Sequence, residues 1–224
     1  MQLEKVTKQR QAEAKRGYED ACGLAHALEL IGERWAPLIL RELWLGARRF
    51  SGLRASLPGI SANVLTQRLG ELEERGLVRR RKLPPPASVQ VYEATEWAMD
   101  AAPMLCDLGR WASRSPGHDP RHPVSPVAIM MSMKVNFDPA RAGGFKGSIA
   151  FHFGEAHYFA EVRDAIIKVE RGEPTFADAT IACDPDALKP VLYGGAPVES
   201  LQVEGDIDMA RRFMTQFSLP PKVG

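Results

Sequence analysis

The 224-residue chain has few cysteines and no long apolar run, and each absence excludes a class of protein. Cys22, Cys106 and Cys183 are too few and too far apart for a disulfide framework, and no CxxC pair indicates a zinc site. No segment approaches the roughly 18 consecutive apolar residues of a membrane span. The charged N-terminal segment also lacks the apolar core of a secretory signal, so we expect a cytoplasmic protein.

Motifs of enzymes are absent as well. The sequence contains no GxSxG or HExxH, and GGFKGS lacks the spacing of a phosphate-binding loop. His118, Asp119 and His122 are close in sequence and could suggest a metal site. Pro120 and Pro123 prevent the helical geometry that would align these three side chains. We therefore expect no enzyme activity, no catalytic residue, no metal and no cofactor.

The basic residues are concentrated in the first half of the chain. Residues 1–115 hold 18 Lys and Arg against 14 Asp and Glu, whereas residues 116–224 hold 11 against 14. Such a mild excess permits binding to a phosphate backbone without proving it. The halves meet at SRSPGHDPRHPVSP, whose prolines and glycine exclude a helix. We therefore divide the chain into a domain over 1–115, a linker over 116–126 and a domain over 127–224.

The first half is predicted to be mostly helical, with a β-hairpin near its end. Good helix formers occupy residues 3–20, and apolar residues then recur at helical spacing in CGLAHALELIGERW, APLILRELWLG and FSGLRASL. A change to strand-like periodicity predicts a hairpin over 77–83 and 88–94, with a stiff tip at PPPA. Thr95 is expected to cap a closing helix in which Pro103 causes a kink or a late start.

The helix before this hairpin has two different faces. Ser61 is a good N-cap, and the helix is predicted to run to about Arg75 with Gly76 as its C-cap. Asn63 and Gln67 lie one turn apart on the side opposite its leucines. The leucines can therefore pack while the amides stay free to enter a groove. These leucines are Leu65, Leu69 and Leu72.

Residues 22 to about 112 resemble the HxlR family of bacterial winged helix-turn-helix transcription regulators. The resemblance rests on Cys22 before an apolar helix, on IGERWAPLILREL, on GARRFSGLRASLPGISANVLTQRLGELEERGLVRR, and on YEATEWA leading to Trp111. It implies a homodimer whose terminal helices pair. It also implies that the helix over residues 61–75 enters the major groove of double-stranded DNA.

The side chains of this region suit contact with DNA. Asn63 and Gln67 are the expected base readers, since amides can bond adenine through two hydrogen bonds. About half of the basic residues on the first hairpin strand can face DNA at once and hold phosphates. The expected DNA-binding residues are Ser61, Asn63, Thr66, Gln67, Arg68, Arg79, Arg80, Arg81 and Lys82. The alternative to DNA binding is an ordinary solvent-exposed helix face, with the arginines paired to Glu71, Glu73 and Glu74.

Cys22 is a candidate redox residue. Some members of the family that the first half resembles use a cysteine at the matching position to sense oxidants or electrophiles. A lone thiol at the start of an apolar helix is more often simply packed, and reactivity requires a lowered pKa.

The second half is predicted to be an antiparallel sheet with helices against one face. Asp184 and Asp206 are expected to cap two of these helices. Alternation of side chains and β-branched runs predict strands at residues 148–153, 158–163, 166–170 and 179–183.

Residues from about 127 to 219 resemble a sterol carrier protein 2-like domain, through GSIAFHFG, ATIACDPDALKPVLYGGAP and VEGDIDMARRF. The resemblance implies a five-stranded sheet and an apolar tunnel for lipids or fatty acyl groups. The same side chains would equally make an ordinary core. The expected pocket residues are Ile129, Met130, Met133, Phe151, Phe153, Phe159 and Phe213.

These observations predict an α+β protein with an N-terminal winged helix-turn-helix domain and a C-terminal sheet domain with flanking helices. We expect a homodimeric transcription regulator that binds palindromic operator DNA and senses a small apolar or lipid-like effector through its second half. Two alternatives remain at this stage. One is a lipid or acyl carrier whose winged helix serves dimerisation, and the other is a thiol redox-sensing repressor acting through Cys22.

Overall fold

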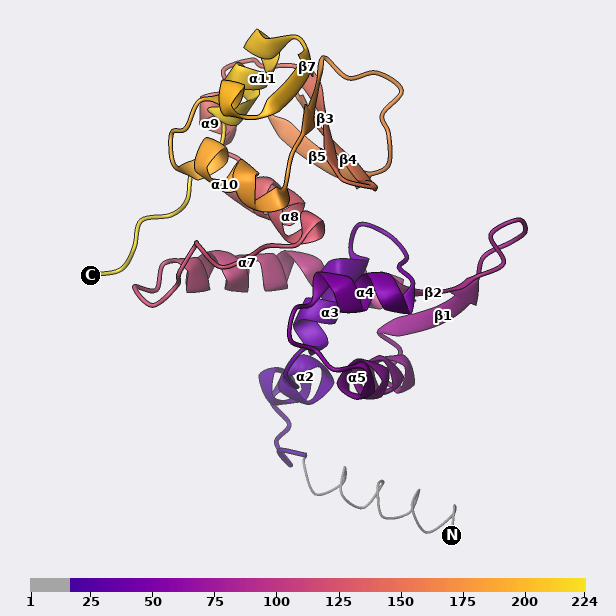
Figure 1. Cartoon of the computed structure of the whole chain (residues 1–224). Coiled ribbons are helices and arrows are strands. Elements are labelled where there is room, and N and C mark those ends of the chain that lie inside the picture. The colour runs from indigo at the N-terminus through magenta and orange to yellow at the C-terminus, as the bar shows by residue number, and fades with distance from the viewer. Residues whose placement is uncertain (1–16) are drawn as a thin grey trace.

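The computed structural model describes residues 17–224, which form a helical half followed by a sheet-containing half (Figure 1). The helix expected over residues 3–20 lies almost entirely outside the described residues. The helices of the first half are Gly23–Ile31 (α2), Ala36–Leu43 (α3), Phe50–Ser56 (α4), Ala62–Glu74 (α5), Glu96–Asp100 (α6) and Ala102–Ser113 (α7). The expected closing helix is therefore two helices, because Pro103 lies in the first turn of α7 and α6 ends before it.

Helix α5 has the caps and the packed face that its sequence predicts. The Ser61 side chain accepts a hydrogen bond from the backbone N–H of Val64 at 3.2 Å. Gly76, just beyond the C-cap Arg75, has a φ of 72°, a conformation that L residues rarely adopt. The three leucines on its inner face are at most 1% exposed. Burial of a leucine side chain contributes about 1.5–3 kcal/mol, so this face fixes α5 on the domain.

A two-stranded antiparallel hairpin follows α5 and forms the wing. Its strands are Val78–Lys82 (β1) and Gln90–Ala94 (β2), paired from Val78 opposite Ala94 to Lys82 opposite Gln90. Arg48 extends this small sheet, because its backbone exchanges two hydrogen bonds with Tyr92, each of 2.8 Å. The wing is thus attached to the segment that leads into α4.

The second half is a five-stranded sheet with helices packed against it. Helices Pro126–Asn136 (α8) and Pro139–Ala142 (α9) precede the sheet. The strands are Gly147–Phe153 (β3), Ala156–Arg163 (β4), Ile166–Arg171 (β5), Ala179–Ala182 (β6) and Gln202–Gly205 (β7). Helix Pro185–Tyr193 (α10), a short 3-10 turn Val198–Ser200 (η1) and helix Ile207–Met214 (α11) complete it. Asp184 and Asp206 cap α10 and α11, as expected.

The expectation of a purely antiparallel sheet is wrong. The strand order is β5-β4-β3-β6-β7, and β6 pairs with β3 in parallel. The last residue of β5 lies level with Phe151 of β3, and the first residue of β6 lies beside Ile149 of the same strand. Residues 172–178 therefore run back across β4 and β3 instead of making a hairpin turn. A connection of that kind brings β6 in parallel to β3. The edge strand β7 was not predicted either.

Helix α8 joins the two halves into one hydrophobic core. It contacts α3 and α7 of the first half and also α10, β4 and β5 of the second. Its buried residues belong to the same packed cluster as Ile39 and Leu40 of α3 and Phe151 of β3. The segment between α7 and α8 has no regular structure, yet the two halves are not independent in their packing. Among residues 17–224, no helix is long and apolar enough to cross a bilayer.

Candidate nucleic-acid interface and the cleft between the halves

Helices α4 and α5 form a helix-turn-helix unit with a free outer face. Between them lie only residues 57–61, which bend the chain so that α5 presents its N-terminal half outward. Ser61, Asn63, Thr66 and Gln67 are all exposed on this half. The Gln67 amide donates a hydrogen bond to Glu71 Oε1 at 2.8 Å, which holds it along the helix. The structure therefore brings four of the expected DNA-binding residues onto one accessible surface.

Arg68 does not share this surface. Its side chain is 13% exposed, lies 3.0 Å from a carboxylate oxygen of Glu33 and also pairs with Glu71. These pairs hold α5 against the loop between α2 and α3. Arg68 is one helical step from Gln67 and therefore points to a different side of the helix. Its side chain thus lies apart from the four exposed residues and helps to fix the position of α5.

The basic residues of the wing point to both of its faces. Arg79 and Arg81 both approach Glu93 on β2, at 2.5 and 3.0 Å, and Arg80 on the other face pairs with Glu73 of α5. The hydrogen bond from Arg80 lowers the pKa of Glu73. Lys82 is exposed near the tip. Exposed ion pairs of this kind contribute only about 0–1 kcal/mol, so phosphate oxygens can replace the carboxylates.

Two further arginines were missed by the sequence reasoning. Arg49 is the residue before α4 and Arg54 lies in its last turn, and both are exposed. In helix-turn-helix proteins the first helix crosses the DNA backbone, so basic side chains there suit phosphate contacts. Their position in ARRFSGLRAS, directly before α5, was the available signal.

Apolar side chains are exposed on two helices of the first half. Leu24 and Leu28 are one turn apart on α2, and they are 69% and 45% exposed. Met104, Leu108 and Trp111 follow one face of α7 at spacings of four and three residues, with Trp111 69% exposed. A run of large exposed apolar residues on one helix face indicates an interaction surface.

The three cysteines have different environments. Cys22 is exposed and precedes α2, where backbone N–H groups of Ala25 and Leu24 lower the pKa of its thiol. Burial raises the pKa of Cys106, and burial together with Asp184 raises that of Cys183 to about 11. The thiolate is the reactive form of cysteine. Of the three thiols, Cys22 is thus the one whose surroundings favour the thiolate.

The residues expected to line a lipid pocket are mostly core. Six of the seven are between 0% and 6% exposed, and the rings of Phe151 and Phe213 lie 6.1 Å apart. The seventh, Phe159, lies on the opposite face of the sheet, half exposed. Alternation along β3 directs Phe151 and Phe153 toward the helical side of the sheet, where α11 packs on β3 and α8 packs on β4 and β5. Most of the predicted tunnel lining is therefore packed interior, and among the seven residues only Phe153 also lines the hollow described next. The six buried residues are Ile129, Met130, Met133, Phe151, Phe153 and Phe213.

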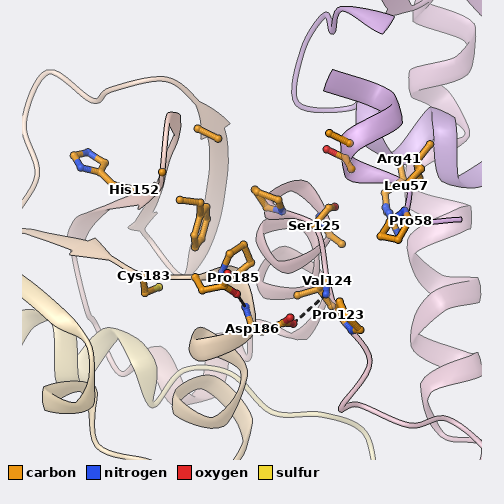
Figure 2. Close-up of a pocket in the computed structure, with 18 of the residues that line it drawn as sticks. Arg41, Leu57, Pro58, Pro123, Val124, Ser125, His152, Cys183, Pro185 and Asp186 are labelled. Carbon is orange, nitrogen blue, oxygen red and sulfur yellow. Dashed lines mark hydrogen bonds between the residues drawn. The ribbon is translucent and has the colours of Figure 1, made fainter. Parts of the chain in front are cut away.

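A hollow instead lies between the two halves of the part of the chain that the structure describes (Figure 2). It has a volume of about 1320 Å³ and is lined by α3, α4, the start of α8, the β3–β4 turn and the segment between β6 and α10. Apolar side chains on its walls include Trp35, Leu38 and Phe153, and Arg41 adds a charge. Trp35 has a φ of 81°, a strained conformation that often marks a functional site. Sequence reasoning missed this cleft because its walls come from separate segments.

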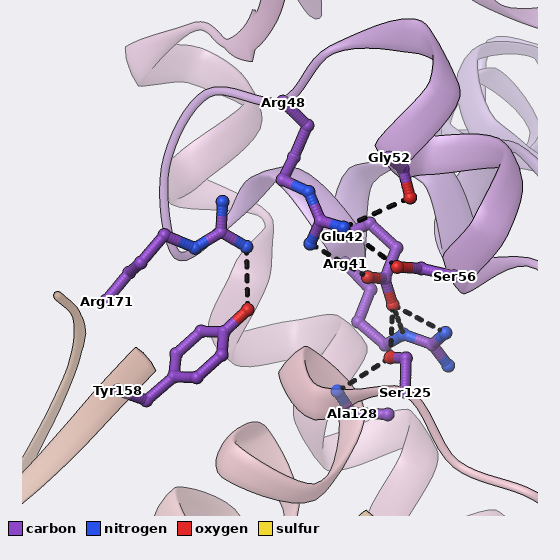
Figure 3. Close-up of polar contacts among 9 residues, drawn as sticks. All are labelled: Arg41, Glu42, Arg48, Gly52, Ser56, Ser125, Ala128, Tyr158 and Arg171. Carbon is purple, nitrogen blue, oxygen red and sulfur yellow. Dashed lines mark hydrogen bonds and ion pairs between the residues drawn. The ribbon is translucent and has the colours of Figure 1, made fainter. Parts of the chain in front are cut away.

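A buried carboxylate lies beside this cleft and connects the halves (Figure 3). Glu42 of α3 is fully buried and accepts hydrogen bonds from Arg41 at 2.9 and 3.1 Å and from Ser125 Oγ at 2.6 Å. Ser125 in turn caps α8 by accepting from the Ala128 N–H at 3.0 Å. Arg48 lies 3.6 Å from the other carboxylate oxygen, and burial, with nearby Arg171, lowers its pKa. The start of α8 is thus bound to the winged helix by a polar contact.

Comparison with known proteins covers the first half. Residues 30–119 match the family described as HxlR-like helix-turn-helix. The HTH-type transcriptional regulator YvaP of Bacillus subtilis is 37% identical over 87 residues, which are 39% of this chain and 81% of that protein. The regulator YodB of the same organism is 33% identical over 88 residues, 39% of this chain and 79% of that protein.

A solved structure of reduced YodB from B. subtilis aligns at 30% identity and a TM-score of 0.40, covering 45% of this chain and all of that one. The family match ends at residue 119, before the sheet of the second half. On the identity and coverage of its relatives, the chain belongs to the HxlR-like helix-turn-helix family.

Proposed function

We propose that this regulator binds palindromic operator DNA as a homodimer and that a small molecule in the cleft between its halves controls the binding. The observation that carries the proposal is the exposed N-terminal half of α5 beside a basic wing, in a chain whose relatives are HTH-type transcriptional regulators. A helix of this kind fits the major groove, and the amides of Asn63 and Gln67 suit adenine.

The remaining polar residues of the surface hold the phosphate backbone. Ser61 and Thr66 flank the base-reading amides, and the wing contributes Arg79, Arg80, Arg81 and Lys82. Arg49 and Arg54 of the first helix join this set, and Arg68 leaves it because Glu33 and Glu71 hold it. Phosphate contacts of this type position the protein without specifying sequence.

A second copy of the chain covers the exposed apolar residues of α2 and α7. Leucine, methionine and tryptophan side chains on these helices would bury their surface by pairing with the same helices of a partner. A twofold dimer matches a palindromic operator, since its two recognition helices then meet half-sites one or more helical turns apart.

Helix α8 is the proposed route from the cleft to DNA. The start of α8 lines the cleft, and α8 also packs on α3. Helix α7, which carries part of the proposed dimer surface, packs against α8 as well. A ligand between the halves would favour one angle of α8 relative to α3 and thereby one spacing of the recognition helices. It can shift this balance only by its different affinity for the two arrangements. The apolar walls indicate a small, largely apolar effector.

The DNA-binding assignment is tested with the double variant Asn63→Ala, Gln67→Ala. Operator sequences are first selected from random DNA with the full-length protein, and affinities for operator and scrambled DNA are then measured by fluorescence anisotropy. Each lost amide contact costs about 1–3 kcal/mol of discrimination, so the loss of both should lower the preference for operator by about 30-fold or more.

The matched control is Glu74→Gln, an exposed substitution on the far end of α5. It should keep the preference for operator. An unchanged preference in the double variant would show that α5 does not read bases.

The effector site is tested with Leu38→Arg, which introduces a charge into the apolar wall of the cleft at a residue that is 39% exposed. Native mass spectrometry and thermal shift of the wild type identify bound apolar compounds, and Leu38→Arg should lose them. Ile166→Arg, the same change at a 69% exposed position on β5, should retain them. Equal binding by both variants would move the effector site away from the cleft.

A thiol switch at Cys22 is the second candidate, supported by the exposure and lowered pKa of that thiol. An electrophile that adds to the thiolate would change the start of α2, where the proposed dimer surface begins. In this case the electrophile should alter operator affinity of the wild type and leave that of Cys22→Ser unchanged. The same response in both proteins would exclude Cys22 as the sensor.

A further inference from the structure

Two histidines and a glutamate meet on the sheet face opposite the core. His152 of β3 and His157 of β4 are directly paired across the hairpin turn between these strands. Their rings stack with centroids 4.2 Å apart. Glu173 follows β5, and its place is set by the hydrogen bond of the preceding Gly172 N–H to the His157 carbonyl at 2.9 Å. Three segments of the sheet thus hold the three side chains together.

The nitrogen and oxygen atoms of this cluster face one another. Glu173 Oε1 lies 3.1 Å from His152 Nε2 and 2.5 Å from His157 Nδ1. One atom from each of the three residues lies within 4.8 Å of the others. Zn²⁺ binds histidine nitrogen at about 2.0–2.1 Å and carboxylate oxygen at about 2.0–2.2 Å, so donors to one ion are roughly 3–4 Å apart. Small rotations of the side chains would reach this geometry.

We propose that His152, His157 and Glu173 bind a divalent transition-metal ion, with Zn²⁺ as the best match. Two imidazoles and one carboxylate are a ligand set that zinc uses when it keeps a further position open. Binding requires that the inward nitrogens carry lone pairs, so their protons move to the other ring nitrogen or to solvent. This site revises the expectation from sequence that the chain holds no metal.

The competing interpretation is an ion-pair network without a metal. In that case both imidazoles donate a proton to the same carboxylate, His157 to Oε1 and His152 to Oε1 or, at 3.3 Å, to Oε2. A cation at the centre satisfies all three groups at once. The side chains are 33%, 38% and 52% exposed, so an ion can enter from solvent and a water can complete its coordination. Within residues 17–224, these three side chains form the group whose possible metal-ligand atoms lie close together. Asp119 of the linker, by contrast, is paired with Arg121.

The site adjoins the cleft described above. His152 is one of the residues that line the cleft, so the open coordination position is accessible to an anionic group of a molecule bound there. The proposal itself concerns the metal alone and does not depend on DNA binding. A titration without DNA therefore tests it separately from the proposed function.

The test is isothermal titration calorimetry of ZnCl₂ into the untagged full-length protein, with its thiols kept reduced by a phosphine. The wild type should bind one ion per chain at this site. His157→Ala should weaken that binding by about 100-fold or more, since even partners that only support metal ligands are worth about 10–100-fold. Glu173→Gln should weaken it as well, because an amide is a poorer zinc ligand than a carboxylate.

The matched control is the double variant His118→Gln, His122→Gln, which removes two histidines of the linker and should bind Zn²⁺ as the wild type does. Absorption of the Co²⁺ form should lack the thiolate charge-transfer band that cysteine ligands would give. If His157→Ala does not fold, the half-exposed Glu173→Gln provides the same comparison. Equal affinity of the wild type and the folded cluster variant, or no binding by the wild type, would overturn the proposal.

Discussion

Removal of the Ser125 hydroxyl should destabilise the whole protein more than removal of an ordinary helix cap. Ser125 Oγ caps α8 and also donates to the buried Glu42 carboxylate at 2.6 Å. Loss of an N-cap costs about 1 kcal/mol, and loss of a hydrogen bond to a charged group costs about 1.5–3 kcal/mol. We therefore expect Ser125→Ala to lower the free energy of unfolding by about 2.5–4 kcal/mol.

The control is Ser61→Ala, which removes the same hydroxyl from a helix cap that is exposed and has a single hydrogen bond. It should cost about 1 kcal/mol. For a chain of this size each kcal/mol lowers Tm by about 2–4 °C, so Ser125→Ala should melt roughly 3–12 °C below Ser61→Ala. Urea and thermal unfolding followed by circular dichroism measure both. Equal losses of stability in the two variants would show that the hydrogen bond from Ser125 to Glu42 does not stabilise the contact between the halves.

Three further outcomes are expected. At pH 8, a thiol reagent should modify Cys22 first and Cys183 last. With a pKa of about 11, roughly a thousandth of the Cys183 thiol is thiolate at pH 8, about 100-fold less than for a thiol of pKa 9. Mass spectrometry of peptides gives the order of modification, and faster labelling of Cys183 than of Cys22 would contradict the prediction. Glu93→Gln should free Arg79 and Arg81 and raise affinity for random DNA. At about 0.9 in log–log slope per added phosphate contact, the salt dependence should steepen by up to about 1.8 per chain. An unchanged slope would place these arginines away from the phosphates. Trp111→Ser should shift the protein from dimer to monomer in sedimentation equilibrium, whereas the same change at exposed Trp97, outside the proposed contact, should not.

The recognition helix could be predicted because its signals are local. A serine cap, leucines at helical spacing and a glycine at the end are read within 16 residues, and each appears in the structure. The wing was predicted for the same reason, since alternating residues around PPPA specify a hairpin. The pairing of Arg68 with Glu33 was not predicted, because Glu33 comes from another segment.

Features that depend on long-range contacts could not be predicted. The parallel pairing of β3 with β6 follows from the path of residues 172–178 across the sheet, which no periodicity encodes. The walls of the cleft come from segments far apart in the sequence, from Trp35 to Gln202. The histidine cluster had a partial signal, because HFGEAH places two histidines on either side of a tight turn. Its glutamate is 16 residues farther on and only the fold brings it there.

The hydrogen bond between Ser125 and Glu42 joins positions 83 residues apart in the sequence. A buried carboxylate that loses a hydrogen-bond partner destabilises the fold, whereas a neutral residue at position 42 would not need the Ser125 hydroxyl. The two positions are therefore under one constraint, and related chains that carry both halves should change them together. The winged helix in this protein has an interior adapted to its second half. Separating the halves would remove the Ser125 hydrogen bond from Glu42, leaving it only Arg41 and Arg48, and would expose the apolar surface that α8 covers.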